Sequence, residues 1–180
     1  MWTTNSVNNL IKNPCAVEDF KYWTIDEDGG DKWTIEDLPG DAGQFFPDPT
    51  VKKYFVTSYQ TCKKSQIIDL QNEGFSAEIM DEAQPPIIIT DWYASRKDSG
   101  CQYELLVRLI SEDKKILQEF RPQPLILPER DGQWHYVTHT FSNYGPGVRY
   151  IFFQHGGKDT KFWAGWYGVR VTNSSISIDI

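Results

Sequence analysis

Short apolar or alternating runs follow one another along almost the whole chain, and turn-forming residues separate them. Alternation with a period of two is typical of strands that bury one face. The intervening stretches, rich in Gly, Pro and Asp, recur about as often as antiparallel strands require. Strands are expected in residues 20–25, 32–38, 52–59, 65–71, 86–95, 103–110, 114–120, 134–141, 148–155, 165–171 and 174–180. Turns are expected in residues 26–31, 38–43, 96–100, 128–133 and 143–147.

This pattern predicts an all-β fold in which two antiparallel sheets pack as a β-sandwich, because each strand then buries one face. A closed barrel is the alternative. Only residues 76–83 look helical. A chain of 180 residues is long enough for one domain with a true core and short for two. The aromatic content of 14% also favours strands.

The chain is acidic, with a net charge of -7, so its surface as a whole would not attract a phosphate backbone. Nucleic acid is therefore not expected as a partner. The pairs Lys52-Lys53, Lys63-Lys64 and Lys114-Lys115 are dispersed and are expected at solvated strand edges. No run of about 18 apolar residues occurs, and the start lacks a secretory pattern, so no membrane insertion is expected.

Three cysteines, Cys15, Cys62 and Cys101, lie far apart in the sequence and are odd in number. Such cysteines fit reduced thiols better than a disulfide framework, which predicts a cytoplasmic location. The glycosylation sequon at Asn173 is then expected to be unmodified, because it is used only in the secretory pathway.

The three histidines do not form a metal site. His135 and His139 share one face of an expected strand, but four residues of strand separate them by about 13 Å, too far to bind one ion. His155 stands alone beside two glycines. All three are expected to be structural or surface residues.

The stretch at residues 26–31 resembles a calcium loop because Asp26, Asp28 and Asp31 cluster, but the spacing is wrong and no distal Glu closes it. A plain hairpin turn is favoured. Phosphate-binding and nucleophile-elbow motifs do not occur. No metal and no cofactor are therefore expected, and binding rather than catalysis is the better hypothesis.

The stretch "KFWAGWYG" crowds four aromatic rings into six positions. The preceding Gly156-Gly157 pair predicts a turn-rich approach, which would leave Phe162 and Trp163 on a loop. If a strand begins near Gly165, the next two rings, Trp166 and Tyr167, enter it on opposite faces and at least one of them is a core residue.

Two further residues on expected loops, Tyr59 and Asp98, can join Phe162 and Trp163 at one end of a sandwich. Flat rings offer a stacking surface for the apolar face of a pyranose, and a carboxylate accepts hydroxyl or amide protons. The residues thus suit a sugar-binding site. The alternative is that Trp163 and Trp166 are both core residues.

Several long motifs carry a family resemblance. The segments "NLIKNPC", "DGGDKW", "VKKYFVTSYQTCKKSQIIDL", "DWYASRKDSG", "YGPGVRYIFFQHGGKDT" and "WAGWYGVRVTNSSI" together closely resemble the F-box-associated domain of the sugar-recognising F-box proteins. The likeness runs from about Asn9 to Ile178. It implies an antiparallel, galactose-binding or jelly-roll-like β-sandwich of about ten strands with a short helical insert, formed by residues 9–180. Residues 1–8 are then an N-terminal extension, and no F-box is expected in this chain.

The resemblance also implies a function. Such a domain is a non-catalytic substrate-recognition module of a cullin-type ubiquitin ligase, and it binds the chitobiose core of high-mannose N-glycans on misfolded glycoproteins in endoplasmic-reticulum-associated degradation. The ligase adaptor and cullin are implied as partners only if an F-box precedes the domain in the full-length protein. A cytosolic sugar-processing enzyme is a further alternative, but it needs a catalytic pair.

Mapped by motif, the glycan-binding residues of the family fall on Tyr59, Asp98, Phe162, Trp163 and Ala164. Two positions depart from the family pattern. Phe162 lacks the hydroxyl of the usual Tyr, and Ala164 stands where the strongest sugar binder has a lysine. The alternative function is therefore a protein-interaction domain of the same fold with weak or lost glycan binding.

Overall fold

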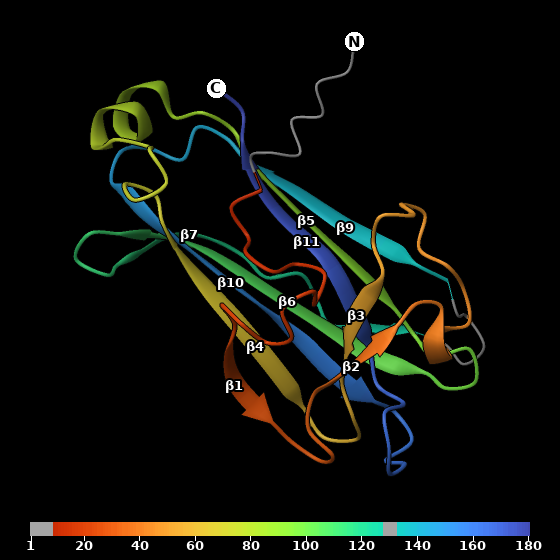
Figure 1. Cartoon of the computed structure of the whole chain (residues 1–180). Helices are drawn as coiled ribbons and strands as arrows, with labels where there is room; N and C mark the ends of the chain where they lie inside the picture. The colour runs from red at the N-terminus through yellow and green to blue at the C-terminus, as the bar shows by residue number, and fades with distance from the viewer. Residues whose placement is uncertain (1–8, 128–132) are drawn as a thin grey trace.

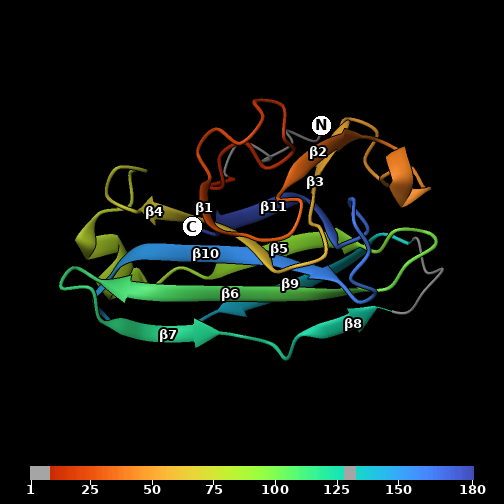
Figure 2. The ribbon, with the colours of Figure 1, turned by 90° about the horizontal axis from the view of Figure 1, so that it is seen from below.

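The computed structural model describes residues 9–127 and 133–180, which form two antiparallel sheets. The six-stranded sheet has the order β1 (Thr24–Asp28), β4 (Cys62–Asp69), β10 (Val148–Asp159), β6 (Cys101–Ser111) and β7 (Ile116–Phe120), with β8 (Leu125–Leu127) also paired to β6. The five-stranded sheet has the order β2 (Thr34–Asp37), β3 (Lys53–Val56), β11 (Arg170–Ile178), β5 (Ile87–Ala94) and β9 (His135–Phe141). Figures 1 and 2 show the two layers. The predicted sandwich is confirmed, and the barrel alternative is wrong.

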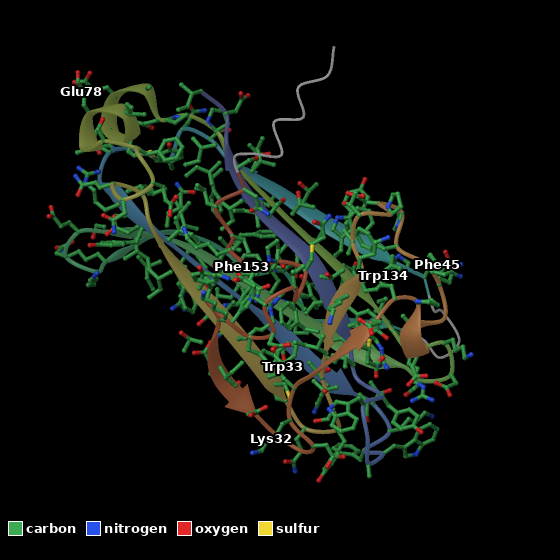
Figure 3. All side chains as sticks on the ribbon, viewed as in Figure 1. Lys32, Trp33, Phe45, Glu78, Trp134 and Phe153 are labelled. Atoms are coloured by element: carbon green, nitrogen blue, oxygen red, sulfur yellow. The ribbon has the colours of Figure 1, made fainter. Side chains whose placement is uncertain are left out.

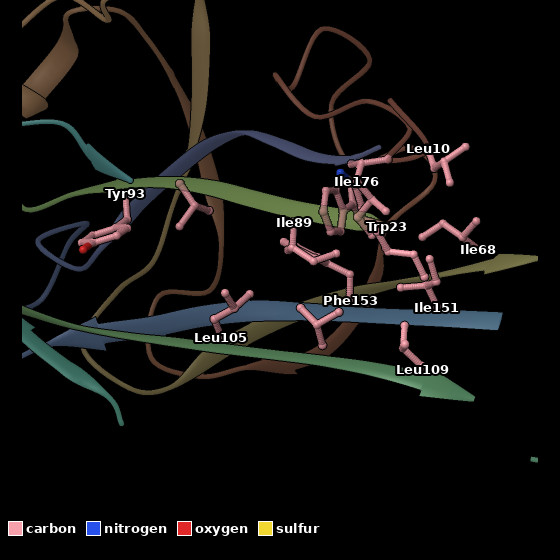
Figure 4. Packing of buried hydrophobic residues seen from close by; sticks show 14 of the residues in the cluster. Leu10, Trp23, Ile68, Ile89, Tyr93, Leu105, Leu109, Ile151, Phe153 and Ile176 are labelled. Carbon is pink, nitrogen blue, oxygen red and sulfur yellow. The ribbon is translucent and has the colours of Figure 1, made fainter. Parts of the chain in front are cut away.

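Alternation along the strands generates the core. In β6 every second residue is buried, from Cys101 to Ser111. Ile151 and Phe153 of β10 meet Ile89 of β5 and Ile176 of β11 between the sheets (Figure 4). Burying one such side chain contributes about 1.5–3 kcal/mol relative to leaving it exposed. The inward faces of both sheets therefore supply the main hydrophobic stabilisation.

Several strand predictions need correction. Residues 20–23 form turns, so the first strand begins at Thr24, and β8 was not predicted. The two runs at 165–171 and 174–180 give one strand that begins only at Arg170. It contains a bulge, because the pairing of β11 with β5 shifts register between Thr172 and Ser175.

The Gly156-Gly157 pair is not a turn, since both residues lie inside β10. A Cβ on Gly156 would lie 1.9 Å from the carbonyl oxygen of Cys62 in β4. A Cβ on Gly157 would lie 1.8 Å from the carbonyl oxygen of Gln102 in β6. Glycine is needed here because the neighbouring backbones approach too closely for any side chain.

The turn near residues 26–31 is also not a hairpin. The strand before it, β1, pairs with β4, whereas the strand after it, β2, pairs with β3 in the other sheet. The three aspartates have separate partners: Asp26 accepts from Gln154, Asp28 from the backbone of Trp33, and Asp31 from the backbone of Gly165. The turn therefore carries the chain from one sheet to the other.

The predicted helical insert is confirmed at η3 (Ile79–Ala83), where the N–H of Gln84 donates to the Ile79 carbonyl. Arg149 and the backbone of Gly147 donate to Asp81, and these hydrogen bonds lower the pKa of Asp81 to about 2. A short 3₁₀ turn, η2 (Gly40–Ala42), was not predicted. Extension 1–8 and nearly all of the predicted turn at 128–133 lie outside the described residues.

The first described residues lie along the end of β11. The N–H of Leu10 donates to the Ile176 carbonyl at 2.8 Å, and the N–H of Ile176 donates to Asn9 Oδ1 at 3.1 Å. At the other end of the chain, the N–H of Asp179 donates to the Pro86 carbonyl at 3.0 Å. Both terminal segments are therefore fastened at the same end of the sandwich, which is the upper end in Figure 1.

All three cysteines are free, as predicted. No helix in the described part of the chain is long and apolar enough to cross a membrane.

A polar network is buried between the sheets, and it includes a lysine that was expected at the surface. Lys64 is 0% exposed, and its Nζ lies 2.7 Å from Nε2 of His155. The other ring nitrogen, Nδ1, lies 2.7 Å from Oδ2 of Asp91. Tyr103 and Ser174 donate to the Asp91 carboxylate at 2.5 and 2.6 Å. We call these five residues the Asp91 network.

The network also involves aromatic rings. Nζ of Lys64 lies 3.1 Å from the centroid of the Trp23 ring and 3.8 Å from that of Phe55. These contacts favour a cation in a site that water cannot reach. Burial opposes this effect and lowers the pKa of Lys64. Burial also lowers the pKa of His155 to about 4, helped by the charge of Lys64 and opposed by Asp91. The imidazole is therefore neutral, so Nδ1 donates to Asp91 and Nε2 accepts from Lys64.

The state of His155 makes stability depend on pH. The pKa of His155 is about 4 when folded and 6.5 ordinarily, so the unfolded chain binds the extra proton between these values. The free energy of unfolding should therefore be fully retained above pH 6.5 and should fall by about 3 kcal/mol as the pH drops toward 4. Urea unfolding of wild type and His155→Gln across this range measures the effect. Equal pH slopes for the two proteins would contradict the assignment.

Candidate binding site

Three loops meet at one end of the sandwich, the lower end in Figure 1. They connect β3 to β4, β5 to β6, and β10 to β11. The N–H of Asp159 donates to the Ser58 carbonyl at 2.9 Å, and the N–H of Thr160 donates to the Gly100 carbonyl at 3.3 Å. The five residues predicted for the site lie on these loops: Tyr59, Asp98, Phe162, Trp163 and Ala164. The structure thus brings together segments that are up to about a hundred residues apart in the sequence.

Two carboxylates fix the loop that carries the rings. Oδ1 of the buried Asp159 accepts the N–H of Lys161 at 2.7 Å and that of Phe162 at 2.6 Å. Oδ2 of Asp31 accepts the N–H of Gly165 at 2.6 Å. These bonds hold Phe162 in the left-handed region, with φ of 56°, which an aromatic residue rarely adopts. The fixed backbone leaves the Phe162 side chain exposed.

The two rings on the loop are open to solvent. Phe162 is 69% exposed and Trp163 is 45% exposed. The Trp163 ring packs edge-to-face against Tyr167, with the centroids 5.2 Å apart at an angle of 86°. This contact restricts the indole ring while leaving much of its surface accessible. The prediction that Phe162 and Trp163 lie on a loop is confirmed.

A chain of contacts joins Asp98 to Trp163. Nε of Arg96 lies 2.7 Å from Oδ1 of Asp98 and forms an ion pair with it. The guanidinium carbon of Arg96 lies 4.1 Å from the centroid of Tyr167, whose ring supports Trp163. The Asp98 side chain is still 50% exposed. Arg96 therefore positions an accessible carboxylate relative to the indole ring.

The remaining predicted residues contribute differently. Tyr59 is half-buried, and its ring packs so close to Gly30 that a Cβ there would lie 3.0 Å from Cδ1. Ala164 is exposed but offers no side-chain donor or acceptor. Tyr59 is thus a more restricted ring than Phe162 or Trp163, and the position of Ala164 is open to solvent.

Neither Trp166 nor Tyr167 enters a strand, and the expectation that one of them is a core residue is wrong. Both are half-buried. Trp166 packs on a small cluster formed by Ala42, Tyr54 and Val56, and its indole N–H donates to the Lys32 carbonyl at 3.0 Å. The reason is that β11 begins at Arg170, so both rings remain on the loop. There Trp166 contacts the small cluster and Tyr167 contacts the Trp163 ring.

Sequence reasoning missed three residues that organise the site: Arg96, Asp31 and Asp159. Arg96 could have been suspected, because it stands two positions before Asp98. The partners of Asp31 and Asp159 are backbone N–H groups on the third loop, and no residue pattern marks such partners in advance.

A hollow of about 280 Å³ lies elsewhere, on the outer side of the six-stranded sheet. Its lining includes Lys63, Glu104, Arg121, Pro122 and Gln154, with no phenyl, phenol or indole ring. Because stacking on a sugar needs such a ring, the loop end is the better candidate for sugar binding.

Removing the Asp159 carboxylate should loosen the loop. In Asp159→Ala, the N–H groups of Lys161 and Phe162 lose their acceptor, and we expect their amide hydrogens to exchange about tenfold faster or more. Hydrogen exchange followed by mass spectrometry measures this change. Asp48→Ala is a matched control, because Asp48 holds the backbone of Thr50 in a similar turn. Unchanged exchange at 160–165 in Asp159→Ala would contradict the assigned role.

The chain matches a family described as "F-box associated region" over residues 2–178. It is 58% identical over 171 residues to F-box only protein 6 of Bos taurus, covering 94% of this chain and 64% of that protein. It is 55% identical over 171 residues to F-box only protein 44 of Homo sapiens (94% and 67%). It is 51% identical over 174 residues to F-box only protein 2 of Bos taurus (95% and 59%). The chain thus spans only about three fifths to two thirds of these relatives.

Solved structures of low sequence identity share the fold. TmCBM61 in complex with beta-1,4-galactotriose superposes with a TM-score of 0.58 at 13% identity, covering 95% of this chain and 99% of that one. A family 16 carbohydrate-binding module superposes with a TM-score of 0.54 at 17% identity, covering 93% and 99%. At such identities the likeness establishes the β-sandwich fold alone.

Proposed function

The chain belongs to the F-box-associated family, and on this premise we propose that it is a non-catalytic module that binds the chitobiose core of N-linked high-mannose glycans. The observation that carries the proposal is the pair of exposed rings, Phe162 and Trp163, held on a fixed loop. Arg96 and Tyr167 link this loop to the accessible carboxylate of Asp98. General support comes from the fold, which is shared with structures described as carbohydrate-binding modules.

Each residue has a distinct chemical role in this proposal. The Trp163 ring stacks on the flat C–H face of a pyranose, and Phe162 adds apolar surface for an acetamide methyl. Asp98 accepts protons from sugar hydroxyl or amide groups. Tyr59 borders the site from the neighbouring loop. Arg96, through its ion pair and its contact with Tyr167, keeps the carboxylate and the indole in a fixed relation.

The cellular role follows as a second step of the proposal. The relatives are named F-box only proteins, and we propose that residues 9–180 are the part that selects misfolded glycoproteins for a cullin-type ubiquitin ligase in endoplasmic-reticulum-associated degradation. This role places the domain in the cytoplasm. It requires an F-box in the full-length protein to bind the adaptor.

A protein-interaction domain with weak glycan binding is the second candidate, and one observation favours it. Ala164 supplies no cation beside Trp163. The loss of one charge-assisted hydrogen bond costs about 1.5–3 kcal/mol, which lowers the affinity by about tenfold to a hundredfold. The exposed rings would then serve as contacts for a protein rather than a sugar.

Calorimetric titration with N,N'-diacetylchitobiose and with mannose tests the proposed function. Chitobiose should bind in preference to mannose, and Trp163→Ala should weaken chitobiose binding by about tenfold or more, because the stacking surface is lost. The same change should lower the free energy of unfolding by less than about 1 kcal/mol, since the ring is largely exposed. Equal or absent heat for both sugars would contradict the proposed glycan recognition and would favour the protein-interaction domain.

Restoring a cation should strengthen binding. Ala164→Lys places an ammonium beside the stacking ring, where it can donate to a sugar oxygen, and we expect chitobiose affinity to rise by about tenfold. Gln71→Lys adds the same charge near the helical insert at the opposite end and should change nothing. If both variants bind as wild type does, position 164 does not line the glycan site.

A further inference from the structure

Over three adjacent strands, the exposed part of the outer face of the five-stranded sheet carries no charged side chain. Arg170 at the start of β11 also points outward, but it is buried and lies 3.7 Å (Nη2 to Oε1) from Glu36. Along β11, β5 and β9, inward residues such as Ile176, Ile89 and Asp91 are buried, and those between them point outward. Eight outward residues are partly or fully exposed: Ser175, Ser177, Ile88, Thr90, Trp92, Tyr136, Thr138 and Thr140. Five of these are serine or threonine, and two, Trp92 and Tyr136, bear aromatic rings. We call these eight residues the hydroxyl face.

Strand register aligns these residues in rows. Ser175 pairs with Thr90, which pairs with Thr138, and the next row holds Ser177, Ile88 and Thr140. The Thr138 hydroxyl donates to the Ile89 carbonyl at 3.0 Å and lies 3.3 Å from the Thr90 hydroxyl. Within the described part of the chain, the hydroxyls of Ser175, Ser177 and Thr140 have no hydrogen-bond partner. They remain available to a bound molecule.

Aromatic rings border the hydroxyl face at its end nearest to the Asp98 loop. Trp92 and Tyr136 have centroids 4.9 Å apart, and Tyr136 is 59% exposed. Phe46 packs edge-to-face on Trp92 at 4.9 Å and on Trp134 at 5.3 Å. Figure 3 shows Trp134 and Phe45 on this side of the molecule, well away from Phe153 in the core. Phe46 therefore covers part of the Trp92 ring, while Tyr136 stays open for stacking.

The absence of charge selects the class of ligand. The chain carries 24% charged residues and a net charge of -7, yet none of the eight positions is charged. A phosphate, an acidic segment or a basic segment would find no countercharge there. An uncharged molecule rich in hydroxyls matches the face, because serine and threonine both donate and accept and the rings stack on C–H groups.

We infer that the hydroxyl face binds an uncharged hexose oligosaccharide, as the mannose arms of the glycan whose core occupies the loop end. The choice of mannose rests on the proposed function. Residues 41–46 connect the two surfaces. Oδ2 of Asp41 lies 3.6 Å from Nη1 of Arg96, which also pairs with Asp98. Phe46 packs on Trp92 of the hydroxyl face. One branched glycan then contacts both surfaces, and each adds to the affinity of the other.

Calorimetry on the whole chain with two probes separates the surfaces. The probes are N,N'-diacetylchitobiose and a mannopentaose that lacks N-acetylglucosamine. Tyr136→Ala should weaken mannopentaose binding by about tenfold and leave chitobiose binding unchanged. Trp163→Ala should do the reverse. Tyr22→Ala, which removes an exposed tyrosine near β4, should affect neither. Ser177→Glu provides a second variant, because a charge placed among the hydroxyls should also weaken mannopentaose binding.

The outcomes distinguish the two proposals. Chitobiose binding without mannopentaose binding, or a mannopentaose affinity unchanged within twofold in both Tyr136→Ala and Ser177→Glu, overturns this inference and leaves the proposed function intact. Mannopentaose binding that depends on Tyr136, without chitobiose binding, supports the inference and removes the proposed core recognition. A dimer seen by sedimentation that Tyr136→Ala dissociates would make the face a self-association surface and overturn the inference.

Discussion

The hydrogen bonds of the buried Asp91 carboxylate constrain how the two sheets pack on each other. This carboxylate is buried on β5, where an unpaired charge would cost several kcal/mol, and it is satisfied by residues of three other strands. Ser174 comes from the same sheet, whereas Tyr103 and His155 come from the opposite one. The hydrogen bonds require one register between the layers, which an apolar core alone would not define. Lys64 of β4 joins the network through its contact with His155.

This register also positions the end of the sandwich that carries the candidate site. His155 and Asp159 belong to the same strand, β10, so the network that fixes the strand also fixes the carboxylate that begins the third loop. Asp159 in turn holds the backbone that exposes Phe162. Recognition by exposed rings needs this support, because a ring on a mobile loop loses conformational freedom when it binds. The buried charge and the exposed platform are thus parts of one structural unit.

Much of the fold follows from local pattern, and most of the site does not. Alternation in β6 and β5 is visible in the sequence. The burial of Lys64 is not, because it depends on the approach of His155 and Trp23 from distant parts of the chain. The roles of Gly156 and Gly157 depend on how closely β4 and β6 approach, which is a non-local property. The passage of residues 29–33 between sheets is likewise set by pairing with distant strands. The site residues were named through family motifs, whereas Arg96, Asp31 and Asp159 became visible only when the loops were brought together.

The hydrogen bonds that hold both terminal segments beside β11 and β5 make the two ends of the sandwich different. Leu10 and Asp179 are hydrogen-bonded at the end of the sandwich that holds the helical insert, and the loops of the candidate site lie at the opposite end. The first described residues and the last ones are therefore held at the end of the sandwich opposite to the candidate site. Under the proposed function, the sandwich would act as a spacer of fixed length between a ligand held at these loops and a domain joined at the opposite end.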